Sequence, residues 1–356
     1  MLEILDGIQT VWNSINNTEK PILMYGMGNG AEKVAAVLKD MNIKIDGIFA
    51  SDEFVRGQLF LGFRVMTYNE AMNMFGDFAI ILAFGTSIPE LMEKIINLSQ
   101  KHELFVPDIP LFGGGLFDEK YVEDNKGKID AAYSLMYDEC SRKTFDSIVK
   151  YKYSGDIKYL LECETPRQEV FDRIIKFGTD EVYMDLGAYD GDTVEEAVEL
   201  MNGRYDKIIA VEPAKKNFKK LTSRVLSYAD SSRIECINMG IYSKRSCLSF
   251  SGKSGRNVAI DEAGKDVVEV DSIDNIAGNS KVTYIKMDIE GAERHGILGG
   301  AGIIRKYRPK LTVSAYHRTG DIFELPLLIH SVNSDYKIFL RHHPYIPAWE
   351  TNIYAI

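Results

Sequence analysis

The stretch VYMDLGAYDGDTVEEA, residues 182–197, decides the fold of the second half of this 356-residue chain. An apolar run leads into two glycines and then into an amphipathic pattern, so the sequence predicts a strand, a tight turn and a helix. Three acids, Asp185, Asp190 and Asp192, lie in or beside the turn. Glycine-rich turns of this type usually hold anionic phosphate, so such an acidic turn indicates a different ligand.

The same alternation of strands and helices continues to the last residue. Beyond a helix that starts near Thr193, the sequence predicts strands at KIIAVE, RIECIN, VTYIKMD and KLTVSAY, a hairpin-like section at 241–270, and closing strands YKIFLRH and TNIYAI. The last two strands are separated by so few residues that they must form a hairpin. The final strand is therefore predicted to run antiparallel to its neighbour in an otherwise parallel sheet.

The first half of the chain has a similar pattern. Residues 21–52 read as strand, glycine-rich turn, helix and strand, and FAIILAF at 78–84 reads as a buried parallel strand. We therefore predict a small Rossmann-like domain over 1–115. The stretch PDIPLFGGGLFDEK places a junction near 107–127, and we expect a helical cover segment over 116–180 and a second domain over 181–356.

Composition excludes several classes of protein. The net charge of -10 and the pI near 5.3 argue against nucleic acid as a partner. The longest apolar run is much shorter than the ~20 residues of a membrane helix, and the acidic first ten residues do not resemble a signal peptide. The four cysteines are scattered, which predicts neither a disulfide framework nor a zinc site. We expect a cytoplasmic protein with no membrane partner.

The acidic turn should line a pocket, because ligands of open α/β sheets bind beyond the carboxyl ends of the strands. Three carboxylates would repel a pyrophosphate, whereas S-adenosyl-L-methionine carries a sulfonium and an ammonium that carboxylates can balance. Glycines would let the backbone approach the ligand. The predicted cofactor loop comprises Asp185, Gly187, Ala188, Asp190, Gly191 and Thr193. The alternative for Asp192 and Thr193 is a helix cap.

Glu212 supports the same cofactor. It ends the strand in IIAVEP, 21 residues beyond Gly191, where an acid can accept both ribose hydroxyls of an adenosine ligand. The alternative is a solvated loop carboxylate. Pro213 follows it, and Asn238, after the third strand, is predicted to approach the adenine.

The motifs YMDLGAYDGDT, AVEP, VEVDSID and YIKMDIEGAERHGILGGA, taken in order, resemble the FkbM-type S-adenosylmethionine-dependent methyltransferases over about 180–356. The resemblance implies methylation, at oxygen, of a hydroxyl on a sugar-like or other secondary-metabolite acceptor. The expected fold class is α/β with two doubly wound sheets: a small Rossmann-like domain, and a class I methyltransferase domain whose last strand is antiparallel.

Candidate catalytic groups follow the fourth and fifth strands of this sheet. Asp288 and Glu290 are predicted to face the acceptor or the methionine end of the cofactor, and His317 to take the acceptor's proton, although a lone histidine is often structural. Glu293 reads as a first-turn acid favoured by the helix dipole. No metal is assigned, because the spacing is not diagnostic. The alternative is a divalent ion held by Asp288, Glu290 and His317.

The first domain has its own glycine turn, with Gly26, Gly28 and Gly30 before a helix and Asp52 following the second strand. A nucleotide or nucleotide-sugar is the predicted ligand, but Ala31 stands where the dinucleotide fingerprint has its third glycine. The alternative for this domain is packing or homodimerisation. The alternative for the whole chain is a non-catalytic binding or scaffold protein, and nothing around residues 21–52 indicates hydride transfer.

Overall fold

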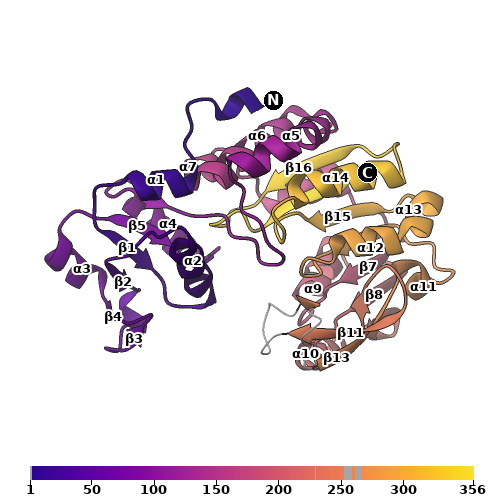
Figure 1. Ribbon diagram of the computed structural model, residues 1–356. Helices are drawn as coiled ribbons and strands as arrows, with labels where there is room; N and C mark the ends of the chain where they lie inside the picture. The colour runs from indigo at the N-terminus through magenta and orange to yellow at the C-terminus, as the bar shows by residue number, and fades with distance from the viewer. Residues whose placement is uncertain (1, 229, 252–258, 261–265) are drawn as a thin grey trace.

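In this computed structural model, the structure describes residues 2–228, 230–251, 259–260 and 266–356. Within them lie an N-terminal six-stranded sheet, a C-terminal seven-stranded sheet and a smaller four-stranded sheet beside the latter (Figure 1). No helix among the described residues is long and apolar enough to span a membrane.

The N-terminal sheet has the strand order β3-β4-β2-β1-β5-β6 and is parallel except for β3, which pairs antiparallel with β4. Its strands are β1 (Ile22–Tyr25), β2 (Gly47–Phe49), β3 (Leu59–Phe60), β4 (Phe63–Met66), β5 (Ala79–Leu82) and β6 (Leu104–Phe105). The central strands β1 and β5 are buried throughout, as their unbroken apolar sequences predict.

Helices connect these strands, and local sequence signals set several of their ends. They are α1 (Val11–Asn17), α2 (Asn29–Asp40), α3 (Tyr68–Phe75) and α4 (Pro89–Ser99), with short 3-10 turns η1 (Leu2–Leu5) and η2 (Asp52–Phe54). A capping box between Thr67 and Glu70 starts α3, and Pro89 occupies the first turn of α4.

The segment between the two sheets is mostly helical. It contains α5 (Glu119–Ser134), α6 (Glu139–Ser154), α7 (Lys158–Leu161), α8 (Arg167–Val170) and a π-helical turn η3 (Phe171–Ile175). The side chains of Asp118 and Asp138 cap α5 and α6, and Gly155 ends α6 in a left-handed conformation. Helix α5 packs against α14, and α6 packs against β16.

The C-terminal sheet has the strand order β16-β17-β15-β14-β7-β8-β9. Its strands are β7 (Val182–Leu186), β8 (Lys207–Val211), β9 (Ile234–Ile237), β14 (Tyr284–Met287), β15 (Lys310–Ser314), β16 (Ile338–His342) and β17 (Thr351–Ala355). The last strand, β17, pairs antiparallel with both β15 and β16. The predicted α/β class, with a reversed final strand in the second sheet, is confirmed.

The helices of this half are α9 (Asp192–Leu200), α10 (Lys215–Val225), α11 (Ile273–Ala277), α12 (Glu293–Gly299), α13 (Ala301–Tyr307) and α14 (Asp321–Val332), with a 3-10 turn η4 (Ser231–Arg233). The section predicted as hairpin-like forms β10 (Gly240–Ile241), β11 (Ser246–Ser251), β12 (Ala259–Ile260) and β13 (Asp266–Asp271). Strand β11 pairs antiparallel with β12 and β13. The rest of that section, 252–258 and 261–265, lies outside the described residues.

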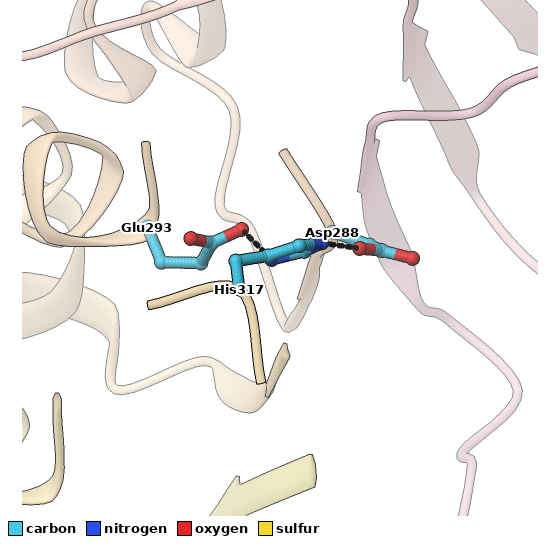
Figure 2. Close-up of side chains that lie close together, drawn as sticks. All are labelled: Asp288, Glu293 and His317. Carbon is cyan, nitrogen blue, oxygen red and sulfur yellow. Dashed lines mark ion pairs between the residues drawn. The ribbon is translucent and has the colours of Figure 1, made fainter. Parts of the chain in front are cut away.

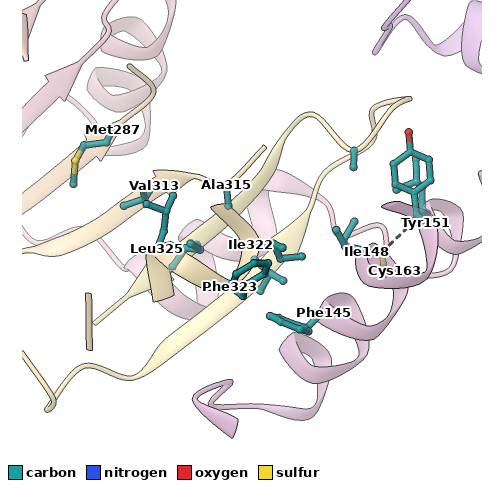
Figure 3. Packing of buried hydrophobic residues seen from close by; sticks show 14 of the residues in the cluster. Phe145, Ile148, Tyr151, Cys163, Met287, Val313, Ala315, Ile322, Phe323 and Leu325 are labelled. Carbon is teal, nitrogen blue, oxygen red and sulfur yellow. Dashed lines mark hydrogen bonds between the residues drawn. The ribbon is translucent and has the colours of Figure 1, made fainter. Parts of the chain in front are cut away.

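One hydrophobic cluster runs through both halves of the chain. Figure 3 shows Phe145 and Ile148 of α6 near Phe323 of α14, with Val313 of β15 beyond them. The two halves of the chain also meet near the carboxyl edge of the second sheet. There Thr86 pairs with Ile346 through two backbone hydrogen bonds. The N-terminal sheet is thus packed beside the edge where the predicted site residues lie.

Candidate functional site

A pocket of about 520 Å³ opens at the carboxyl edge of the C-terminal sheet. Its wall includes the turns after β7, β8, β14 and β15, together with side chains from β15 and β17. Leu111, from the segment between the two sheets, also lines it, and the Nζ of Lys33 on α2 donates a hydrogen bond to the Leu111 carbonyl. The first domain therefore supports one wall of the pocket.

Gly187 and Gly191 shape the turn after β7. Glycine is needed at both positions because of the backbone conformation and of nearby protein atoms, and not because of a ligand. Both have positive φ, 83° and 93°. A Cβ on Gly187 would lie 1.9 Å from the carbonyl oxygen of Asp288, and one on Gly191 would lie 3.1 Å from the side chain of Leu221. Gly187 lines the pocket, whereas Gly191 does not appear in its wall. The glycines let the loop pack against β14 and α10.

The acidic residues of the turn are mostly paired inside the protein. Asp185 is fully buried, lies 3.2 Å from the Nζ of Lys286 on β14 and accepts a hydrogen bond from Thr193 Oγ1. Asp190 pairs with Arg224 of α10. Of the three acids only Asp192, together with Thr193, is part of the pocket wall. Folding thus supplies cations for two of the three carboxylates, and the predicted contact of all three with the ligand stays a prediction.

Glu212 and Pro213 line the pocket where β8 ends. The Glu212 carboxylate is 5% exposed and accepts hydrogen bonds from the backbone N–H groups of Tyr189 and Ala214. Burial raises the pKa of Glu212, and these N–H groups oppose the rise. Asn238 is not part of the described pocket wall; its Nδ2 donates to the carbonyl oxygens of Glu212 and Pro213. These bonds tie Asn238 to the loop after β8, and its predicted approach to the adenine stays a prediction.

His317 follows β15 and lies among carboxylates from the loop after β14. Its Nδ1 is 3.0 Å from Glu293 Oε1, and its Nε2 is 3.4 Å from Asp288 Oδ1 and 3.6 Å from Glu290 Oε2. Figure 2 shows the ring between Glu293 and Asp288. His317 is 1% exposed, whereas Asp288 and Glu290 are partly accessible. The sequence-predicted catalytic residues are therefore brought together in the pocket wall.

This arrangement determines the charges in the cluster. Burial alone would lower the pKa of His317, but Glu293, Asp288 and Glu290 outweigh it and raise the pKa to about 10. Burial raises the pKa of Glu290 to about 8, with the neighbouring acids adding to the rise and His317 opposing it. Burial would also raise the pKa of Asp288, but Lys286 and His317 lower it.

Glu293 has a role that the sequence pattern did not indicate. Its side chain is 1% exposed, and Oε1 accepts hydrogen bonds from the backbone N–H groups of Ile289, at 3.0 Å, and Gly291, at 3.4 Å. The same oxygen faces His317. The side chain therefore ties the turn after β14 to the turn after β15. It was predicted only as a first-turn acid of α12.

The sequence analysis also did not identify Lys286 as a site residue, although its position in the sequence is unusual. It is the one charged residue of the apolar strand β14, YIKM, and its Nζ donates to the Gly187 carbonyl as well as pairing with Asp185. A lysine inside a buried strand needs a fixed anion, so its position could have indicated the pair. Tyr316 Oη donates to Asp288 Oδ1, and the Trp349 ring packs on Gly85 of the first domain.

A polar compartment extends from the cluster over one face of the sheet. Arg167 lies there, paired with Glu196 and Glu350. Nothing in the sequence marked Arg167, because it comes from the helical cover segment and reaches the pocket only through the tertiary fold.

The glycine turn of the first domain is tightly packed. A Cβ on Gly30 would lie 2.4 Å from the Ala83 carbonyl oxygen, and one on Gly26 would lie 2.9 Å from the Phe84 ring. Gly28 caps α2 with open space around it. None of these glycines, nor Asp52, is part of the described pocket wall. Packing accounts for two of the glycines, and the nucleotide prediction for this turn stays a prediction.

The residues that build this pocket lie in a segment that matches a known protein family. Residues 185–344 match the family model described as the methyltransferase FkbM domain. Residues 185–344 form an FkbM methyltransferase domain. The FkbM domain thus includes the turn at Gly187, Glu212 and the cluster around His317. A search of curated proteins finds no match for the chain.

Solved structures show the fold. The chain superposes on the methyltransferase FkbM from Methylobacillus flagellatus KT with a TM-score of 0.72 and 20% identity, over 99% of this chain and 92% of that one. Both halves of the chain therefore share its fold. Fibrillarin from Aeropyrum pernix, with natively bound S-adenosyl-L-methionine, matches at TM-score 0.31 and 14% identity, over 51% and 70% of the two chains. A precorrin-6y C5,15-methyltransferase from Geobacter metallireducens matches at 0.34 and 11%, over 51% and 82%.

Proposed function

We propose that the protein is an S-adenosylmethionine-dependent methyltransferase that methylates a hydroxyl of a small polar acceptor, sugar-like or nucleotide-linked. One observation carries the proposal. A single pocket in the FkbM domain has Glu212 on its wall at the end of β8 and the cluster around Asp288 and His317 at the ends of β14 and β15. A cofactor portion and an acceptor portion can therefore meet within one cavity.

The pocket residues fit the cofactor. The partly apolar portion beside Glu212 is lined by Pro213, Met239 and Ile241, which suits a flat purine ring. The Glu212 carboxylate accepts hydrogen bonds from two backbone N–H groups and from Asn217 Nδ2, and the remaining lone pair on Oε2 can accept a ribose hydroxyl. Bound S-adenosylmethionine supplies an electrophilic methyl group on its sulfonium.

The acceptor would occupy the polar part of the pocket. Trp349 and Tyr345 offer aromatic surface, and Asn352 and Glu350 offer polar groups, a combination that suits a hydroxyl-rich ring. Without a further cation nearby, His317 is a weak base in this cluster. With its pKa near 10 it already carries a proton at neutral pH, so it can donate to Asp288 but cannot accept the acceptor's proton. In this proposal Asp288, Glu290 and Tyr316 contact the acceptor.

Calorimetry tests the cofactor assignment. The wild-type chain should bind S-adenosylmethionine and S-adenosylhomocysteine, and Glu212→Gln should weaken both, because each charged hydrogen bond contributes ~1.5–3 kcal/mol, or roughly 10- to 150-fold in affinity. Glu235→Gln is the matched control, since Glu235 lies on the exposed side of β9, paired with Lys207. Binding of NAD in place of either compound would contradict the proposal.

The alternative is a binding or scaffold protein that kept the fold. Incubation with methyl-labelled S-adenosylmethionine and a panel of sugars and nucleotide-sugars separates the two, because only an enzyme transfers the label and releases S-adenosylhomocysteine. The cytoplasmic location is part of our proposal and is supported by four free cysteines, two of them exposed.

A further inference from the structure

The cluster at His317 has the spacing of a coordination shell. Nε2 of this 1% exposed side chain lies 3.4 Å from Asp288 Oδ1 and 3.6 Å from Glu290 Oε2. Both separations are longer than the ~2.7–2.9 Å of a charged hydrogen bond. Two ligands of one ion, each bound at ~2.1 Å, lie roughly 3.0–3.4 Å apart for angles between the octahedral and tetrahedral values. The Asp288 separation matches that range and the Glu290 separation lies just above it.

The two glutamates of this cluster also lack a lysine or arginine partner among the described residues, whereas Asp288 lies near Lys286. Among the residues that the structure describes, no lysine or arginine forms an ion pair with Glu290 or Glu293, and Lys286 is paired with Asp185. Buried Glu293 Oε2 and His317 Nδ1 have no hydrogen-bond partner, and the contact of Nδ1 with Glu293 Oε1 is an ion pair. One imidazole therefore faces three carboxylates. A further positive charge at this position would balance the excess of carboxylates.

The outer contacts would hold the ring for a metal. Glu293 faces Nδ1, the nitrogen directed away from Asp288, while its Oε1 is fixed by backbone N–H groups of the β14 turn. Metal-binding histidines are commonly oriented in this way by a carboxylate on their second nitrogen. Asp288, Glu293 and His317 each place one ligand atom within 4.8 Å of the others (Figure 2). Glu290 has a positive φ of 55°, a strained conformation for a residue with a side chain, and its carboxylate contributes to this group through Oε2.

We propose that Nε2 of His317 and the carboxylates of Asp288 and Glu290 bind one divalent cation of the Mn²⁺ or Mg²⁺ type, with Glu293 holding the ring through Nδ1. Carboxylate and imidazole ligands suit such ions. A cation there lowers the pKa of a hydroxyl that binds to it. His317 then serves as a neutral ligand, and no imidazole base is needed. The site is independent of the cofactor assignment, because none of its ligands belongs to the predicted cofactor loop.

Titration of the EDTA-treated full-length chain with MnCl2, followed by calorimetry, tests the proposal. We expect one saturable site, at least 10-fold weaker in Asp288→Asn and in Glu290→Gln. Glu293→Gln should weaken binding roughly 10- to 100-fold, as changes to outer-shell partners do. Glu235→Gln, an exposed acid outside the cluster, should bind Mn²⁺ as the wild type does. Circular dichroism of each variant checks that it is folded.

Pulsed electron paramagnetic resonance of the Mn²⁺-loaded wild type needs no variant, and ¹⁴N coupling from an imidazole is expected. Absence of a saturable site, absence of the ¹⁴N coupling, or equal Mn²⁺ affinity in Asp288→Asn, Glu290→Gln and the wild type would each overturn the proposal. A protonated His317 paired with carboxylates would then explain the cluster. Glu212→Gln should retain the Mn²⁺ site, so loss of cofactor binding and loss of metal binding are separable.

Discussion

Replacing Lys286 with methionine tests the finding that the cofactor turn is neutralised from inside the protein. Lys286 Nζ lies 3.2 Å from Asp185 Oδ1, and the two side chains are 10% and 0% exposed. Burial would lower the pKa of Lys286, but Asp185 and Asp288 outweigh it and raise that pKa above its usual value. Methionine keeps the length of the side chain and removes the charge, so Asp185 is left buried beside the hydroxyls of Thr193 and Tyr183 without its cation.

The expected cost follows from that geometry. Breaking a buried ion pair by removing one partner costs ~3–5 kcal/mol, and the remaining Thr193 hydrogen bond places Lys286→Met at the lower end, about 3 kcal/mol. In a domain of this size each kcal/mol shifts Tm by roughly 2–4 °C, so a fall of about 6–12 °C is expected. The double variant Asp185→Asn, Lys286→Met should recover at least about half of the loss, because the penalty comes from the unpaired charge.

Urea unfolding followed by fluorescence and circular dichroism measures these changes. The chain has two tryptophans, Trp12 in the first domain and Trp349 in the pocket wall, so the two halves can be followed separately by replacing one of them. Lys207→Met is the matched control: its pair with Glu235 is on the surface, with side chains 39% and 50% exposed, and should contribute ~0–1 kcal/mol. The reasoning is refuted if Lys286→Met costs less than about 1 kcal/mol, or if the double variant is no more stable than the single one.

Two further predictions concern other parts of the fold. Gly187→Ala should lower the unfolding free energy by more than about 2 kcal/mol and abolish cofactor binding in calorimetry, because φ is +83° and the new Cβ would meet the Asp288 carbonyl; a stable variant with unchanged affinity contradicts this. Asp138→Asn should cost about 1 kcal/mol at neutral pH, discounted for partial exposure, because Asp138 pairs with Arg341 of β16. Burial raises the pKa of Asp138, but hydrogen bonds from Arg341 and Ser141 lower it by more than burial raises it. The pKa in the folded state therefore lies below the unfolded value near 3.9. The stability difference should therefore be full above about pH 5 and vanish as the pH falls through the folded pKa; a difference that grows in acid excludes this linkage.

Local patterns predicted the elements that build the site. The apolar strand and glycine turn at 182–191, the acid that ends β8 and the acids after β14 all lie at strand ends on one edge of a parallel sheet. Parallel strands place their carboxyl ends together, so proximity follows from strand direction alone. The reversed β17 was also predictable, since a short connection permits only an antiparallel neighbour.

Pairings between distant residues were not predictable in the same way. Asp185 and Asp190 looked like ligand contacts because the sequence shows their charge but not the cations, Lys286 and Arg224, that folding brings to them. Arg167 reaches the pocket from a helix that carries no motif. The sequence predicted Glu293 only as an acid in the first turn of a helix. Its contact with His317 depends on how the turns after β14 and β15 face each other.

The amino-acid sequence by itself determined the succession of strands along the chain, the reversed direction of the last one, the edge of the second sheet at which the pocket opens, and the family of residues 185–344, because each of these depends on local periodicity, turn chemistry or motifs. Only the tertiary structure decided which charges are already satisfied and which remain available to a ligand. Ion pairs and burial are set by side chains far apart in the chain, and their energies change by several kcal/mol over a few ångströms of separation and a change from water to a buried environment.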